Sequence, residues 1–195
     1  MWDGVFSQAR PGLRSSEADI ARAETALGFP LPPSYRAFAR ECGAGVIGGQ
    51  VRIFTPVPVE AADIVPRAHI ISHGVAVAIE SLAANPLTRD EPFRFTVEGD
   101  ADAALMDRAC FFGTTEGGAF LFWDVIEGKN GEYEVWALGA DLETVHYGGA
   151  TLVDLVKGLQ GIEILHILGE GASPLPATFE GDDAAALARL GPTDS

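Results

Sequence analysis

Three carboxylates beside one predicted turn are the strongest candidates for chemistry in this 195-residue chain. Asp124, Glu132 and Glu134 flank the segment 127–131, whose Asn-Gly pair is typical of a tight turn. Two carboxyl groups held about 5 to 10 Å apart in a cleft can act as general acid and base, as in glycoside hydrolysis. Hairpins often carry acids on a solvated face, so a hydrolase using Asp124 and Glu134 is a secondary hypothesis.

The histidines offer a second kind of chemistry. His69 and His73 are four residues apart, which suits two metal ligands on one helix face. No HExxH-type acid accompanies them and Gly74 follows directly, so we interpret them as surface or capping residues, while His146 and His166 stand alone. The sequence contains no G-x-S-x-G, P-loop or G-x-G-x-x-G motif. We therefore predict no catalytic residue, no metal and no cofactor.

A mixed aromatic and acidic surface is predicted on two neighbouring strands, because alternate residues of a strand share a face. If helices cover the purely apolar rows, the opposite face carries aromatic anchors beside carboxylates, an arrangement suited to binding a basic protein. The alternative is that the aromatic residues belong to the core, covered by the middle of the chain. With the acid of the preceding turn included, the predicted partner-binding residues are Glu116, Phe120, Phe122, Asp124, Glu132, Glu134 and Trp136.

Negative charge is concentrated in the second half of the chain. The 28 acidic and 13 basic residues give a formal charge of −15, which disfavours binding to nucleic acid and anionic lipid. Residues 1–50 carry five acids and five bases, whereas residues 101–150 carry nine acids and two bases. A solvated surface is one explanation. A surface that faces a basic partner is the other.

The N-terminus lacks a basic start followed by an apolar run, and no apolar stretch approaches the roughly 20 residues that span a bilayer. We therefore expect a cytoplasmic protein without membrane contact. Cys42 and Cys110 form no CxxC motif and are interpreted as buried apolar residues.

Two helices are predicted near the N-terminus. Glu17–Leu27 follows two serines and ends at Gly28, and a second helix begins at Pro33 and ends before Gly43. Strands are predicted over residues 50–54, Val75–Ile79 and Phe93–Val97, with helical turns possible over residues 59–64.

An antiparallel meander is predicted in the second half. Its strands are 109–113, 119–125, 133–137 and 142–146, and they precede a helix that Thr151 caps. The run 162–168 is too short to be assigned as helix or strand. The predicted fold class is α+β: a mainly antiparallel sheet with helices packed on one side, two of them N-terminal and one closing the domain.

Several segments of the sequence resemble motifs of the SUKH superfamily, of the Smi/Knr type. Its N-terminal signature has a helix ending in leucine-glycine, a leucine-proline entry, and a tyrosine and phenylalanine three residues apart. The matching residues here are Leu27, Gly28, Leu31, Pro32, Tyr35 and Phe38. Residues 111–118 resemble the family's phenylalanine-glycine hairpin with an acidic turn, 120–124 its next strand and 151–160 its closing helix. The resemblance covers roughly Glu17–Gln160.

The resemblance also divides the chain. It implies one SUKH-like domain over residues 1–168, with a core at about 17–160 and a longer middle insertion at 59–108. Residues 169–195 are expected to form a Gly/Pro-rich acidic tail with a short helix.

In function, the resemblance implies a non-enzymatic protein-binding module. Bacterial relatives are typically immunity proteins that neutralise a toxin, often a nuclease, and fungal relatives are interaction hubs in cell-wall control. The leading hypothesis is an immunity protein whose acidic surface occludes the basic groove of a toxin domain in a stoichiometric complex. A regulatory or scaffold protein of the same fold is the alternative.

Overall fold

The structure is a computed structural model that describes residues 2–84, 93–99, 101–126 and 128–189. Within these residues the chain forms one sheet in the order β1-β9-β2-β3-β5-β6-β7-β8-β4. The pairs β1–β9 and β4–β8 are parallel and the other neighbours are antiparallel. The strands are β1 (Gln8–Arg10), β2 (Gly45–Ile47), β3 (Val51–Ile53), β4 (Thr96–Val97), β5 (Ala109–Thr115), β6 (Phe120–Asp124), β7 (Val135–Leu138), β8 (Thr144–Gly149) and β9 (Thr178–Gly181).

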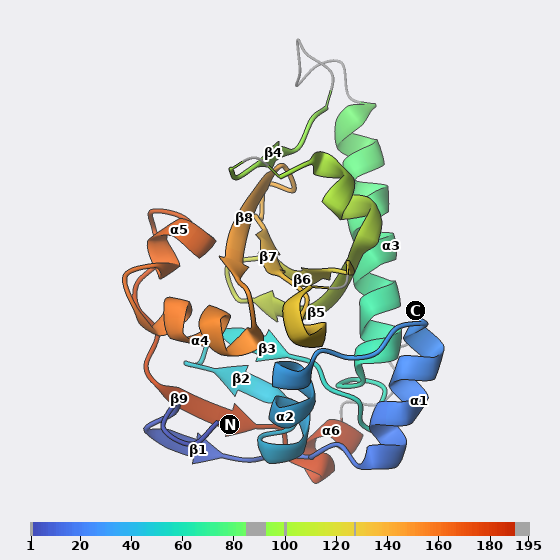
Figure 1. Cartoon of the computed structure of the whole chain (residues 1–195), viewed down its shortest axis with the longest axis vertical. Coiled ribbons are helices and arrows are strands. Elements are labelled where there is room, and N and C mark those ends of the chain that lie inside the picture. Colours follow the sequence, from blue (N-terminus) through green and yellow to red (C-terminus); the bar gives the residue numbers. More distant parts are fainter. Residues whose placement is uncertain (1, 85–92, 100, 127, 190–195) are drawn as a thin grey trace.

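Helices precede, interrupt and follow these strands. Figure 1 shows α3 on one side of strands β5–β8 and the pair α4 and α5 on the other. The helices are α1 (Glu17–Leu27), α2 (Pro33–Glu41), α3 (Ile64–Ala83), α4 (Leu152–Gln160), α5 (Ile164–Leu168) and α6 (Ala184–Arg189), and two short 3₁₀ segments are η1 (Ala103–Arg108) and η2 (Lys129–Gly131). The prediction of an α+β fold with a mainly antiparallel sheet, two N-terminal helices and a closing helix is confirmed. The prediction that the helices pack on one side of the sheet is wrong, because α3 lies on the opposite side from α4 and α5 (Figure 1).

Local sequence signals determine the first helix and the Asn-Gly turn as expected. Ser16 and Asp19 form a capping box at the start of α1, and Gly28 ends the helix with φ 84°. In the Asn-Gly turn, Asn130 has φ 61° and Gly131 has φ 77°. A side chain tolerates this left-handed conformation best when it is asparagine, and glycine adopts it without a penalty.

The middle of the chain differs from the prediction. Val75–Ile79, predicted as a strand, lies inside the 20-residue helix α3, which Asp63 caps by accepting from the Val65 amide. Ala68, Ile71 and Val75 recur at helical spacing and are buried, so tertiary packing against the sheet selects the helix over the local β propensity of valine and isoleucine. Of the predicted strand Phe93–Val97, only Thr96–Val97 forms a strand, as β4.

The segment after Leu168 also enters the sheet. Its strand β9 lies between β1 and β2, pairing Phe179 with Ala9 on one side and with Ile47 on the other. The undecided run 162–168 contains the short helix α5. The division of the chain into a domain and a tail stays a prediction.

An aromatic cluster forms the centre of the core. Trp123 stacks on Phe112 with ring centroids 4.4 Å apart and meets Tyr35 of α2 edge-on at 4.7 Å. The Tyr35 hydroxyl donates to the Phe54 carbonyl at 2.6 Å, and burial raises the pKa of Tyr35 well above its usual value. This side of β5 and β6 is therefore fixed to α2.

The opposite side of β5 carries a second aromatic group. Phe111 precedes Phe112 in the strand, so the two rings lie on opposite faces. The Phe111 ring lies 5.4 Å from Phe122 and 6.0 Å from Phe120, and α3 lies against β5 on this side of the sheet. The sheet thus has aromatic packing on both faces.

Candidate functional site

Two of the predicted partner-binding acids hold the fold together. The Glu132 carboxylate accepts from the backbone amide and the hydroxyl of Ser34, both at 2.7 Å. Ser34 lies in the first turn of α2, whose N-cap Pro32 offers no side-chain acceptor, so Glu132 supplies the missing cap from a distant loop. The Ser34 hydroxyl in turn accepts from the Leu152 amide at the start of α4.

Asp124 is also occupied. Its two oxygens accept from Nε and Nη2 of Arg108 at 2.6 and 2.8 Å, a bidentate ion pair. This hydrogen bond raises the pKa of Arg108. Asp124 is therefore neutralised by a neighbour, while Glu134, its partner in the hydrolase hypothesis, is exposed. This geometry gives the hydrolase hypothesis no support.

The aromatic members of the predicted surface are mostly core residues. Phe122 is fully buried and Trp136 is 5% exposed, so neither ring faces solvent as an anchor. For these two residues the alternative interpretation holds, because the middle of the chain covers this face: Val97 and Met106 pack against the same core. Phe120 is half-buried.

Glu116 and Glu134 are the exposed acids of the predicted set, and they lie near opposite ends of β6. Glu116 is in the turn between β5 and β6, and Glu134 immediately precedes β7. Burial raises the pKa of Tyr147, and the negative charges of Glu134 and Asp154 raise it further. The acids thus form separate exposed sites and not one continuous face.

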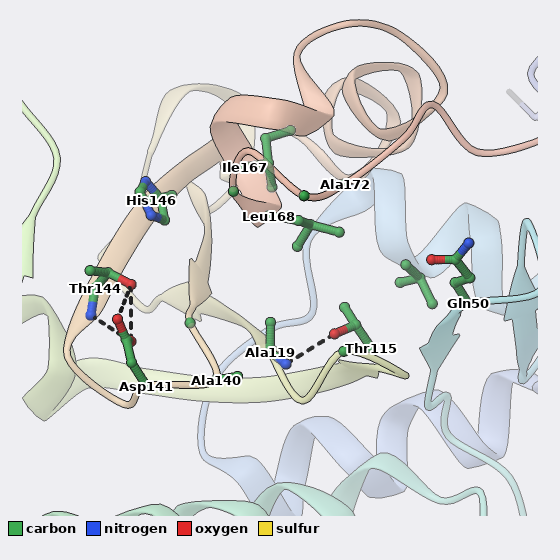
Figure 2. Close-up of a pocket in the computed structure, with 15 residues that line it drawn as sticks. Gln50, Thr115, Ala119, Ala140, Asp141, Thr144, His146, Ile167, Leu168 and Ala172 are labelled. Carbon is green, nitrogen blue, oxygen red and sulfur yellow. Dashed lines mark hydrogen bonds between the residues drawn. The ribbon is translucent and has the colours of Figure 1, made fainter.

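A groove lies at the Glu116 end of the sheet (Figure 2). It encloses about 400 Å³ between the β5–β6 turn, the β7–β8 turn, the start of β3 and the loop after α5. Asp141, hydrogen-bonded to Thr144, and Gln50 stand on opposite sides of it in Figure 2. The lining residues are Gln50, Val51, Thr115, Gly117, Ala119, Gly139, Ala140, Asp141, Thr144, His146, Ile167, Leu168, Gly169, Gly171 and Ala172.

The groove has an acidic rim and an apolar interior. Asp141 lines it, and the exposed residues Glu116 and Glu170 each lie in the chain between two lining residues. None of the described residues that line it is a lysine or an arginine. Isoleucine, leucine, valine and alanine side chains supply its apolar lining. Sequence reasoning found only Glu116, because the groove unites four segments that are distant in the chain.

Two histidines and one glutamate meet beside this groove. The Glu98 carboxylate contacts Nε2 of His166, and its second oxygen lies 3.9 Å from Nδ1 of His146. The Tyr147 amide also donates to Glu98 at 2.9 Å. Glu98 therefore joins the end of β4 to β8 and α5. No cluster of three metal-ligating side chains suited to an ion occurs within the described ranges.

His69 and His73 both lie exposed within α3 and do not cap it. The two cysteines are buried and unpaired, and burial raises the pKa of both thiols to about 12. Neither thiol is activated as a nucleophile, since a reactive cysteine needs a lowered pKa. In the part of the chain that the structure describes, no helix is both long and apolar enough to cross a bilayer.

The fold and the groove define a class: an α+β domain whose mainly antiparallel sheet presents an acidic, apolar-floored groove. Residues 14–157 match the SMI1 / KNR4 family (SUKH-1), and the chain belongs to this family. The match contains both N-terminal helices, the whole meander and most of α4. It is consistent with an immunity or regulatory protein-interaction module. No curated protein matches the chain.

Proposed function

We propose that this protein is a non-enzymatic binding module, an immunity protein that neutralises a basic toxin domain by forming a stoichiometric complex. The observation that carries the proposal is the groove of Figure 2, which combines an acidic rim with an apolar interior. Family membership supports the protein-binding part of the proposal.

The chemistry of the groove favours a lysine or arginine side chain of the partner. Such a side chain has an aliphatic stem, which the apolar lining would cover, and a cationic head, which Asp141, Glu116 and Glu170 would attract. The same acids repel phosphate, which disfavours a nucleic acid as the ligand. Burying a stem inside a groove and a head at its rim provides both affinity and register.

Two further exposed acids would act at longer range. Glu134 and Asp154 are both exposed, and the charge of each raises the pKa of Tyr147. Together with the net charge of −15, they would attract a basic domain before contact and speed its association. A nuclease is a suitable target, because the surface that grips phosphate must be basic. Occlusion of that surface would be the mechanism of neutralisation.

The protein encoded by the neighbouring gene is the first partner to test. We expect the two proteins, co-expressed and purified, to elute as one complex of defined stoichiometry in size-exclusion chromatography with light scattering. We also expect this chain to restore the growth of cells that the neighbour inhibits. A complex with a harmless neighbour would favour the regulatory or scaffold alternative and overturn the immunity role. If the two proteins form no complex and this chain does not restore growth, the proposal is contradicted.

A single substitution that introduces a positive charge tests the groove. Ala140 is exposed and lines the groove, so Ala140→Arg places a positive charge where the partner's cation is expected. We expect the dissociation constant with that partner to rise by roughly tenfold or more. Ala21→Arg, on an exposed position of α1, is the matched control and should bind normally. Equal affinity of both variants would place the interface elsewhere.

Charge reversal of Glu116 or Glu134 tests the role of the exposed acids. Each substitution by lysine should slow association by up to roughly tenfold at low salt and weaken its salt dependence. Glu80→Lys makes the same charge change at an exposed position of α3 and is the control. Unchanged association rates for both reversed variants would remove these acids from the interface.

A further inference from the structure

A second hollow lies on the opposite face of the sheet from the groove. It encloses about 350 Å³ and is lined by Arg52, Phe54, Ala61, Arg67, Ile71, Thr114 and Leu187. In the register of β3 and β5, Arg52 pairs with Thr114, and Val51 pairs with Thr115. Val51 and Thr115 line the groove, and adjacent residues of a strand lie on opposite faces. The two hollows are therefore back to back.

Two guanidinium groups reach this hollow. Arg67 of α3 donates through Nε to the Ala61 carbonyl at 2.9 Å, and its guanidinium lies 5.5 Å from the centre of the Phe54 ring. These contacts fix the plane of the guanidinium and leave the donors of both Nη atoms without a partner among the described residues. Arg52 is held from the other side by Asp182, which accepts from Nη1.

The lack of a carboxylate at Arg67 stands out in a chain with 28 acidic residues. Of the arginines whose side chains are described, six pair with a carboxylate: Arg10, Arg22, Arg36, Arg40, Arg52 and Arg108. Arg14 and Arg94 are exposed, where water solvates the charge. Arg67 is the half-buried arginine in this part of the chain whose charge is met by a carbonyl and an aromatic ring only.

We propose that this hollow, between β3, β5 and α3, is a binding site for a small organic carboxylate. The lining holds two arginines, and Asp182 outside the lining pairs with one of them. The resulting net charge of about +1 complements a monoanion better than a doubly charged phosphate. Arg67 presents the planar donor fork that a carboxylate accepts in two parallel hydrogen bonds.

The rest of the lining indicates the body of the ligand. Phe54, Ile71 and Leu187 form apolar walls, and the Thr114 hydroxyl can donate to a second polar atom. A bare inorganic anion would leave these walls in water, whereas a carboxylate on an aromatic or branched aliphatic body would cover them. The site is independent of the proposed partner groove, so either one can fail without the other.

Benzoate, acetate, inorganic phosphate and neutral benzyl alcohol are the probes. Titration of the ¹⁵N-labelled full chain, followed by amide and arginine Nε–H resonances, should give saturable benzoate shifts centred on Arg52, Arg67 and Thr114. Acetate should bind more weakly because it covers less of the apolar wall, and benzyl alcohol should give no saturable shift there. Tighter binding of phosphate than of benzoate would overturn the assignment to an organic carboxylate.

Three variants locate the site. Arg67→Gln should weaken benzoate binding by about tenfold or more, because hydrogen bonds to a charged donor fork are lost. Arg67→Lys keeps the charge and should still bind more weakly than the parent, since lysine has no fork. Arg94→Gln removes an exposed arginine outside the hollow and should bind as the parent does. Thermal unfolding confirms that each variant is folded, and equal benzoate affinity of Arg67→Gln and the parent would overturn the proposal.

Discussion

The two hollows on β3 and β5 differ in charge although they are separated by the thickness of one strand. The groove on the α5 side is rimmed by acids and has no lysine or arginine among its described lining residues, while the hollow under α3 contains Arg52 and Arg67. A net charge of −15 would not predict this difference. Strand alternation produces it, because Val51 and Arg52 are neighbours in sequence and face opposite sides.

The two faces also differ at the start of β6. Trp123 and Phe112 on the α2 side are fully buried, as is Phe122 on the α3 side, but Phe120 on the α3 side keeps part of its ring in water. One face is thus a closed core and the other a core that opens at its edge. This difference can be tested by substitutions of increasing subtlety.

Truncation of Trp123 and Phe120, two of the three aromatic residues of β6, should give the largest effect. Trp123→Ala removes a fully buried side chain that contacts Phe112 and Tyr35, so we expect a loss of about 3 to 5 kcal/mol in the free energy of unfolding. Phe120→Ala should cost only about 1 to 2 kcal/mol because its ring is half-buried. Chemical denaturation measures both, and equal losses would contradict the distinction between the faces.

The elements that depend on local signals could be predicted from the sequence. The capping box of α1, the proline at the start of α2 and the glycine turn between β5 and β6 act over a few residues, and each predicted element formed. The candidate functional site was harder to predict from the sequence than these local elements. Alternation placed Phe122 and Asp124 on one face correctly, but it could not show that the middle of the chain covers Phe122.

Long-range contacts explain what the sequence missed. Glu132 caps a helix 98 residues away, and the contact of Glu98 with His166 joins residues 68 apart. Strand β9 pairs with β1 across 170 residues. None of these contacts leaves a periodic trace, because a single side chain or a four-residue strand carries it.

Replacement of the two neighbouring glutamates separates a structural acid from a surface acid. Glu132→Gln loses charge-assisted hydrogen bonds to Ser34 at the start of α2, and we expect a loss of about 1 to 3 kcal/mol in the free energy of unfolding. Glu134→Gln, at an exposed position, should change stability by less than about 0.5 kcal/mol.

The matching measurement for this pair is association with the partner. Glu134→Gln should slow this association modestly at low salt. Folded Glu132→Gln should associate as the parent does, because the Glu132 carboxylate of the parent is hydrogen-bonded to Ser34. A stable Glu132→Gln protein that binds its partner poorly would return Glu132 to the interface.

Alkaline titration should give the smallest effect, and it reports on the α2 side. Cys110 pairs with Trp123 in the sheet, and Cys42 ends α2. Burial raises the pKa of both thiols from 9.0 to about 12 and also raises that of Tyr35, so the folded state favours the neutral forms. Their contribution to stability is therefore fully present below pH 9 and is lost as the pH rises from 9 toward 12.

The free energy of unfolding should accordingly be insensitive to these groups between pH 7 and 8.5 and should fall at higher pH. Cys110→Ala should reduce that alkaline slope, because it removes one of the titrating groups from the Trp123 side. An aromatic disulfide reagent at pH 8 should label the thiols only after unfolding. Rapid labelling of the native protein would contradict the closed packing of the α2 side, and would remove the difference between the two faces.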